Sequence, residues 1–220
     1  MTSRSSLTGS WRACASAVVF ISLMSVTACS GSGTASPGSR PSDSQSPSAA
    51  STPTPTATPT ASAIYKPADA TGKAQNVPVP VLPEAAKAET KEGAIAFAKH
   101  WYTLLNYAYQ TGDFKPLDTV TDGGCRMCEK VRPGIVEWNS GGRWIAGGLI
   151  VVRGAFTNFV KTADGNYQVT TQLEQPAGFL YRADSTIEKS VPAAQVLADI
   201  MIVRFTAGAW NAVDVDRLGA

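Results

Sequence analysis

The chain has 220 residues, of which 44% are hydrophobic, 16% are charged and 8% are aromatic, and its formal net charge is +2. The hydrophobic share is that of an ordinary globular protein and excludes disorder over the whole length. The weak net charge excludes the basic footprint of a nucleic-acid-binding domain, so we expect no nucleic-acid partner.

Residues 1–28 have the layout of a secretory signal peptide. Arg4 and Arg12 precede an almost uninterrupted run of apolar and small residues at positions 13–26. This run is too short to cross a membrane as a helix, which takes about 20 residues. Its end, Val26-Thr27-Ala28-Cys29, resembles the lipobox of bacterial lipoproteins. The resemblance implies acylation of Cys29 and cleavage before it; an ordinary secretory signal is the alternative.

A disordered linker is expected over residues 29–83. Ser, Thr, Pro, Ala and Gly make up most of residues 30–63, where no large apolar side chain could offset the entropy of ordering. Further prolines interrupt regular structure as far as residue 83. We therefore predict that an acylated linker holds one domain, residues 84–220, outside the cytoplasm. The membrane partner would be the outer face of the cytoplasmic membrane.

Two helices are expected at the start of this domain. Between Thr90, a good N-cap, and Gly112, a natural C-terminal stop, apolar residues recur at steps of three and four. A shorter helix is predicted within residues 128–139, although Pro133-Gly134 would interrupt it. The apolar stripe of the first helix consists of Ala94, Phe97, Ala98, Trp101, Leu104, Leu105 and Ala108.

Strands are expected in the second half of the domain. A stretch rich in Val, Ile and Phe (149–160) is followed by a turn (163–166) and by alternating apolar and polar residues (167–174). Apolar strands then cover residues 200–205 and 209–215. Helices first and hairpin-linked strands afterwards indicate an α+β domain. The expected architecture is a long N-terminal helix and a short helix packed on a curved antiparallel sheet.

Two family resemblances rest on these segments. The long helix, its end at Thr111-Gly112-Asp113-Phe114 and the hairpin at residues 207–210 resemble the nuclear-transport-factor-2-like cone, over residues 88–216. The lipobox, the Thr/Pro-rich linker and a Cys-x-x-Cys motif together resemble a family of actinobacterial lipoproteins of unknown function. The most specific residues of that family are Gly124, Cys125 and Cys128. The cone implies a pocket between helix and sheet, and neither resemblance transfers a catalytic residue.

Cys125 and Cys128 are the only cysteines expected in the domain, and we predict that they form a disulfide. A redox-active thiol pair is the alternative. One cysteine pair and the distant His100 fall short of the four ligands of a structural zinc site, so no metal or other cofactor is expected. His100 is predicted as a partly exposed helix residue rather than an acid–base catalyst.

Six aromatic or basic residues are candidates for lining the expected pocket. Two of them are arginines that interrupt apolar strand segments, where a buried cation requires a carboxylate or a ligand. Plain core positions for the aromatic rings, and solvent-facing positions or structural ion pairs for the arginines, are the alternatives. The six are Tyr102, Tyr109, Trp138, Arg153, Tyr167 and Arg204.

The function expected from these features is non-enzymatic binding or scaffolding in the cell envelope. The bound species would be a small lipophilic ligand or a partner protein. One alternative is an enzyme on the same fold with acid–base chemistry of the isomerase or hydratase kind, and another is a thiol–disulfide protein that uses Cys125 and Cys128. An open pocket in which a carboxylate faces Tyr or Arg would favour catalysis.

Overall fold

The computed structural model describes residues 63–219, and α1 (Lys91–Thr111) is the longest helix in this part of the chain. It begins as predicted, because the Thr90 side chain accepts a hydrogen bond from the Gly93 N–H at 3.0 Å. It ends at Gly112, which adopts the left-handed conformation that glycine takes without steric cost. Every residue of the predicted apolar stripe is at most 3% exposed, so the stripe forms the helical side of the core.

Three shorter helices accompany α1: η1 (Glu84–Lys87), α2 (Lys115–Asp118) and α3 (Arg126–Trp138). α3 continues through Pro133, so the expected interruption of this helix is wrong. Pro133 is exposed, and water can therefore satisfy the Glu129 carbonyl that the missing proline N–H leaves free.

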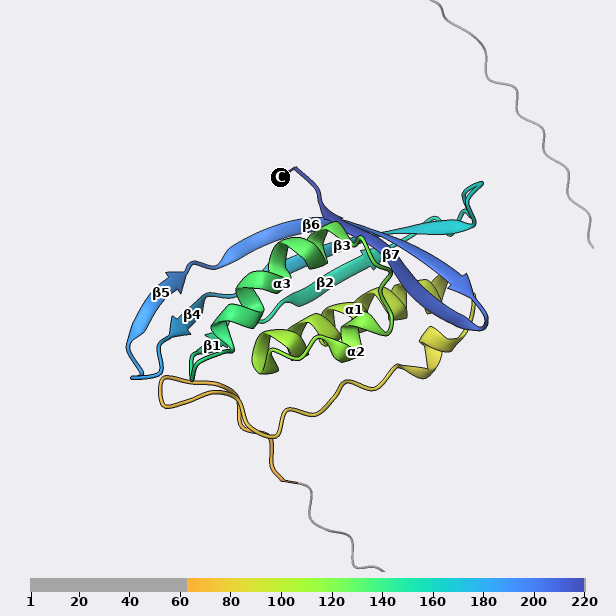
Figure 1. Ribbon diagram of the computed structural model, residues 1–220. Coiled ribbons are helices and arrows are strands. Elements are labelled where there is room, and N and C mark those ends of the chain that lie inside the picture. The colour runs from red at the N-terminus through yellow and green to blue at the C-terminus, as the bar shows by residue number, and fades with distance from the viewer. Residues whose placement is uncertain (1–62, 220) are drawn as a thin grey trace, which may run out of the picture. The chain divides into compact units, whose positions relative to one another are not determined.

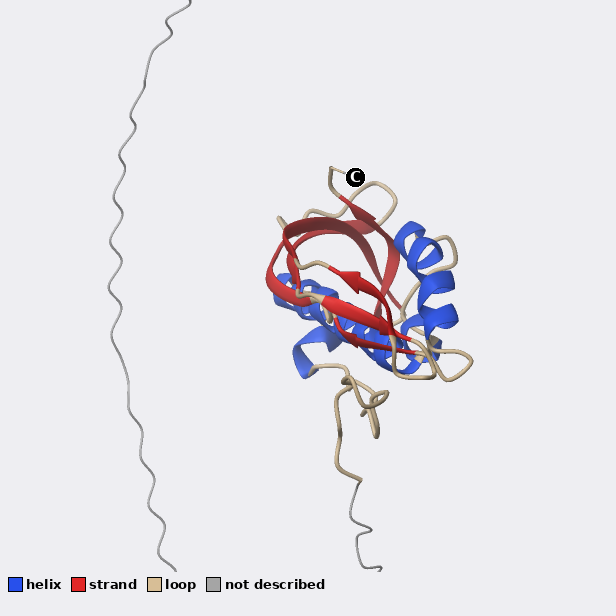
Figure 2. Ribbon diagram, turned by 90° about the vertical axis from the view of Figure 1, so that its left-hand side faces the viewer, coloured by secondary structure: helices blue, strands red, loops and turns tan. Residues whose placement is uncertain are grey.

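A large antiparallel sheet has the strand order β2-β3-β6-β7. The strands are β2 (Val151–Phe156), β3 (Asn166–Gln175), β6 (Ala194–Thr206) and β7 (Ala209–Arg217). The predicted alternation in β3 is confirmed, because every second residue from position 167 to position 173 is buried. The sheet is strongly bent (Figure 1), and the helices pack beside it (Figure 2). α1 contacts β2, β3 and β7, which places the main core between this helix and the sheet.

A second antiparallel sheet, which the sequence does not predict, has the strand order β1-β4-β5. Its strands are β1 (Trp144–Gly147), β4 (Gly178–Tyr181) and β5 (Ile187–Val191). They are four or five residues long and β5 has no buried residue, so no clear alternating pattern marks them. The Trp144 and Tyr181 rings stack with centroids 5.1 Å apart and form a separate small core. Helices packed on antiparallel sheets thus make the domain α+β, as predicted.

Residues 63–83 fold onto the domain, although their prolines predict a linker. The Tyr65 hydroxyl donates a hydrogen bond to the Gln110 side chain of α1 at 2.6 Å. The indole N–H of Trp144 donates to the main-chain oxygen of Asp69 at 2.8 Å. The domain boundary expected at residue 84 is therefore too late. Polar contacts with distant residues hold this segment, and such contacts leave no periodic signal in the sequence.

Several sequence predictions concern residues outside the described part of the chain. The signal peptide, the lipobox with Cys29, and the Thr/Pro-rich part of the linker all lie before residue 63. Within residues 63–219, no helix combines the length and the apolar character that are needed to cross a bilayer.

Candidate binding groove between helix α3 and the small sheet

An open groove lies between α3 and the small sheet. Its volume of about 360 Å³ is within the range of small-molecule sites, which is about 300–1,000 Å³. α3 forms one wall, β4 and β5 form the other, and Tyr109 of α1 and Gln175 of β3 complete the lining. The aliphatic and phenyl side chains of the lining are Val131, Ile135, Ile145, Phe179, Leu180 and Val191, and Trp138 adds an indole ring.

The helical wall follows from the residue spacing in α3. Val131, Ile135 and Trp138 are separated by four and three residues, which places them on one side of the helix. Gly134 lies on the same side, and a Cβ atom at this position would meet no atom within 4 Å. The missing side chain therefore leaves part of the groove open.

Glycines on the sheet side allow two backbones to approach each other. Gly147 and Gly148 have φ angles of +71° and +67°, which residues with a Cβ atom rarely adopt. A Cβ atom on Gly178 of β4 would lie only 3.2 Å from the Gly148 Cα. The absence of side chains at both positions therefore helps the connection after β1 to lie close against β4.

Four polar side chains interrupt the apolar lining, namely Tyr109, Lys130, Gln175 and Lys189. The Gln175 amide donates a hydrogen bond to the Gly148 carbonyl oxygen at 2.9 Å. Burial raises the pKa of the Tyr109 phenol above its ordinary value of 10, so Tyr109 is neutral at physiological pH. Among the described residues that line the groove there is neither a carboxylate nor a histidine. The groove can therefore hold an apolar group and offer it a few hydrogen bonds.

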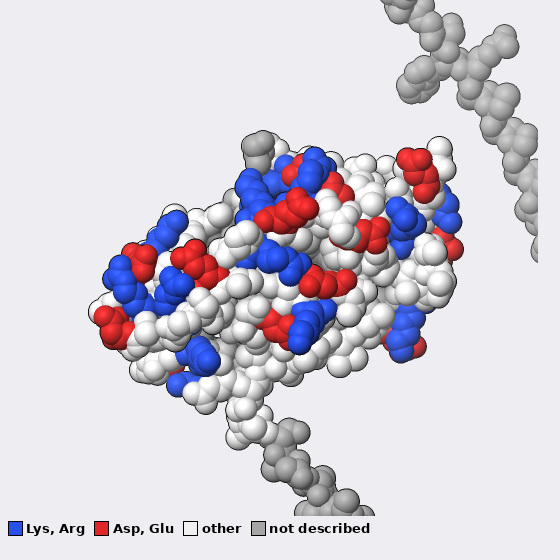
Figure 3. All heavy atoms as spheres, in the orientation of Figure 1, with Lys and Arg blue, Asp and Glu red and all other residues white. Residues whose placement is uncertain are grey.

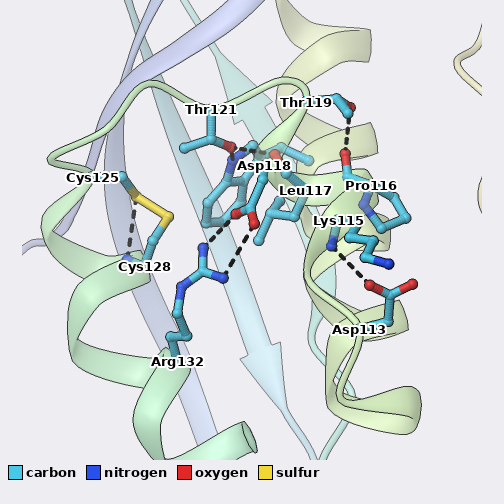
Figure 4. A network of polar contacts seen from close by, with 11 residues as sticks. Asp113, Lys115, Pro116, Leu117, Asp118, Thr119, Thr121, Cys125, Cys128 and Arg132 are labelled. Atoms are coloured by element: carbon cyan, nitrogen blue, oxygen red, sulfur yellow. Dashed lines mark hydrogen bonds and ion pairs between the residues drawn. A yellow bond between two sulfur atoms is a disulfide. The ribbon is translucent and has the colours of Figure 1, made fainter.

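Cys125 and Cys128 form a disulfide in the first turn of α3. Cys125 acts as the N-cap, since its Sγ accepts a hydrogen bond from the Cys128 N–H at 3.2 Å. Figure 4 shows the disulfide near the ion pair between Asp118 of α2 and Arg132 of α3. Both cysteines are at most 5% exposed, which limits attack by an external thiol. The bond thus fixes the start of the helix that forms the groove wall.

Only two of the six predicted pocket residues meet in the groove, and these are Tyr109 and Trp138. The guanidinium group of Arg143 lies 5.1 Å from the centroid of the Trp138 ring and covers it. Arg153 lies outside the groove lining and pairs with the Glu174 carboxylate, at 2.5 Å between Nη2 and Oε2.

Tyr167 and Arg204 belong to contacts outside the groove. The Tyr167 ring stacks on Phe159 with centroids 4.5 Å apart, and its hydroxyl donates to the Glu89 carboxylate at 2.8 Å. Arg204 donates to the Asn166 side chain at 2.9 Å. Neither residue lines the groove, so the predicted set of six does not form one site.

Tyr102 belongs to a buried polar network that sequence reasoning missed. Its hydroxyl donates to Asp199 Oδ2 at 2.9 Å and lies 3.0 Å from Thr171 Oγ1. Arg217 Nε donates to the other Asp199 oxygen at 2.7 Å, and Asp199 is fully buried. Burial and the nearby Asp199 charge raise the pKa of the Tyr102 phenol. The carboxylate thus has partners on both oxygens, and the network is closed rather than open to a substrate.

His100 is only 5% exposed, so the expectation of a partly exposed residue is wrong. Position 100 lies between Phe97 and Leu104 at steps of three and four, which continues the buried face of α1. Burial lowers the pKa of the imidazole below its ordinary value of 6.5. Within the described range, no three His, Cys, Asp or Glu side chains come close enough together to hold a metal ion.

The domain is therefore of the α+β class, with helices packed on two antiparallel sheets and an open groove beside α3. The chain belongs to the family of unknown function DUF6318, which matches residues 63–216. No curated protein matches the chain in sequence.

Two solved structures resemble this chain weakly. The crystal structure of the intermembrane space region of the chloroplast protein ARC6 has 15% sequence identity and a TM-score of 0.43, over 60% of this chain and 98% of that chain. The structure of Aln2 from a Streptomyces species has 10% identity and a TM-score of 0.35, over 55% of this chain and 88% of that chain. Neither likeness is close enough to inform function.

Proposed function

We propose that this protein is a lipid-anchored binding protein of the cell envelope and that the groove beside α3 holds a small lipophilic ligand. The anchor is supported by the signal-like run at residues 13–26 and by the lipobox resemblance at Cys29. Ligand binding rests on one observation, which is the concave and mainly apolar lining of the groove. Such a lining with few polar groups is typical of small-molecule sites, whereas protein partners usually need a larger surface.

Binding is a better proposal than acid–base catalysis because of where the titratable groups lie. A general acid or base must reach its substrate, at about 3 Å or through one water molecule. Asp199 and His100 are buried outside the groove lining, and the described lining offers only Tyr109 and two lysines, Lys130 and Lys189. The isomerase or hydratase alternative would need a carboxylate or an imidazole in the groove.

We also propose that the domain is a cone of the nuclear-transport-factor-2-like type. The support is the contact of α1 with β2, β3 and β7 of the bent sheet. The turn between β6 and β7 at Ala207 and Gly208, both with positive φ, matches the hairpin on which the resemblance rests. Such a cone implies a pocket between the long helix and the curved sheet, whereas the groove lies between α3 and the small sheet, with Tyr109 as the α1 residue in its described lining.

The proposed function is tested by filling the groove. Gly134→Phe replaces a glycine whose Cβ position on the groove side of α3 is open, and it removes a glycine from a helix, so we expect the fold to be retained. The matched control is Val136→Phe on the same helix, at an exposed position outside the lining. The mature chain from residue 29 onward, with Cys29→Ser, allows the assay to be run without detergent.

The probe is N-phenyl-1-naphthylamine, a neutral dye whose fluorescence rises in apolar surroundings. We expect the parent chain and the Val136→Phe control to bind the dye with similar affinity. The Gly134→Phe variant should lose at least tenfold in affinity, because the ring occupies the dye's volume. Equal binding by all three folded chains would show that the groove is not the site.

A further inference from the structure

The two walls of the groove each carry one lysine at the rim. Lys130 is on α3 and Lys189 is on β5, and both are exposed. Neither lysine forms an ion pair within residues 63–219. The formal charge of the described lining is therefore entirely positive, although the domain as a whole carries nearly equal numbers of acidic and basic residues.

Three acidic side chains on the elements that form the groove are already paired with arginines. Glu137 on α3 lies 3.3 Å from Arg143. Glu188, which precedes Lys189 on β5, lies 2.9 Å from Arg182. Glu174 of β3 pairs in the same way with Arg153, as described above.

The sequence neighbour of Lys130 also stays out of the groove. Glu129 lines a separate hollow beside the disulfide and does not line the groove. The positive charge of Lys130 and Lys189 is therefore left for a ligand.

We propose that the ligand is a single-chain fatty carboxylate, with its chain in the groove and its headgroup at Lys130 and Lys189. This inference deepens the proposed function and rests on it. A cationic headgroup would meet two like charges, whereas a carboxylate can accept charge-assisted hydrogen bonds from both ammonium groups. The volume of about 360 Å³ is near the lower end for ligand sites, which favours one acyl chain over a two-chain lipid.

The test compares dodecanoate with 1-dodecanol, which have equal chain lengths and differ in the headgroup. Both ligands displace the naphthylamine dye from the mature Cys29→Ser chain, at a pH where the acid is ionised. We expect dodecanoate to bind about tenfold more tightly than the alcohol at low salt. High salt should reduce this preference without weakening the alcohol, because it screens exposed charges.

The double variant Lys130→Gln, Lys189→Gln should bind the acid and the alcohol about equally, with the affinity for the alcohol unchanged. The control is Lys99→Gln, Lys115→Gln, which removes the same charge from exposed lysines outside the lining and should keep the preference. Circular dichroism establishes that both variants are folded.

The outcomes separate the two proposals. Equal binding of acid and alcohol by the parent chain would overturn the carboxylate inference and leave lipophilic binding intact. Failure of the dye and of both ligands to bind would overturn both proposals. In a further outcome, the parent chain binds no ligand and self-associates, whereas the Gly134→Phe variant remains monomeric. That result would identify a second copy of the chain as the occupant of the groove, and it would also overturn both proposals.

Discussion

Asp199 is an acidic residue in an apolar strand, and its burial depends on hydrogen bonds from Tyr102 and Arg217. The sequence predicts that Tyr102 lines a pocket, with a plain core position as the alternative, and helical spacing does not reveal whether an inward face meets a cavity or a packed core. One sequence signal could have identified the network: Asp199 directly precedes the apolar residues 200–203. An ionised group in such a strand requires partners, and these come from distant segments that a single sequence does not connect.

The burial of a single residue, His100, can be tested by the dependence of stability on pH. Its pKa is lowered by burial in the folded state, so below about 6.5 the unfolded chain binds more protons than the folded chain. Stability should therefore fall as the pH drops below this value, and the loss should continue down to the lower folded-state pKa. We expect the melting temperature to decrease over this range.

The chain contains one histidine, which simplifies the measurement. The His100→Gln variant should show a flatter dependence of melting temperature on pH near 6.5. A parent protein whose melting temperature is constant across this range would contradict the burial of the imidazole.

At the scale of elements, strong periodicity was a reliable guide and weak patterns were not. The stripe of α1 and the alternation of β3 each describe one buried face of a long element, so the sequence predicts both. β4 and β5 are short, and their positions depend on pairing with each other and with β1. One wall of the groove therefore could not be predicted, whereas Trp138 and Tyr109, on predicted helices, could.

Two helical glycines should respond in opposite ways to alanine. A Cβ atom on Gly93 of α1 would lie 2.1 Å from the Ala88 main-chain oxygen, which accepts a hydrogen bond from the Trp210 indole. Gly93→Ala should therefore lower the free energy of unfolding by about 1–3 kcal/mol, because the backbone must shift. Gly134→Ala meets no atom within 4 Å and should raise it by about 0.5–1 kcal/mol.

Urea unfolding of the parent and both alanine variants measures this contrast. Because the change of residue is the same in both helices, helix propensity alone predicts stabilisation in both cases. A stabilised Gly93→Ala variant would mean that η1 and the start of α1 are not packed as closely as described.

At the scale of the whole molecule, the surface gives no sign of charge-driven docking on the face seen in Figure 3. Lys and Arg are interspersed there with Asp and Glu. Membrane attachment would then depend on acyl chains at Cys29 rather than on a basic surface, and two or more chains are needed for stable anchoring.

Substitution of the lipobox cysteine tests this anchor. Cys29→Ser should abolish acylation and leave either an uncleaved precursor or a released protein. Cys14→Ser, which changes the other cysteine before residue 63, should leave processing unchanged. Detergent phase partition and intact mass distinguish these products. A Cys29→Ser protein that is still processed and still enters the detergent phase would rule out the lipid anchor.

The packing of residues 63–83 has a mechanical consequence. Lys66 and Gln75 bridge the start of this segment, and the Trp144 indole holds Asp69. A pull applied at residue 63 would load the Tyr65–Gln110 hydrogen bond to α1 first and the Lys66–Gln75 bridge next, and through Asp69 and Trp144 it would then load β1. The neighbour of β1 is β4, which forms one wall of the groove. If the chain is anchored and the groove holds a ligand, as proposed, tension on this segment would reach the β4 wall of the groove through β1, and stretching would loosen the grip on the bound molecule.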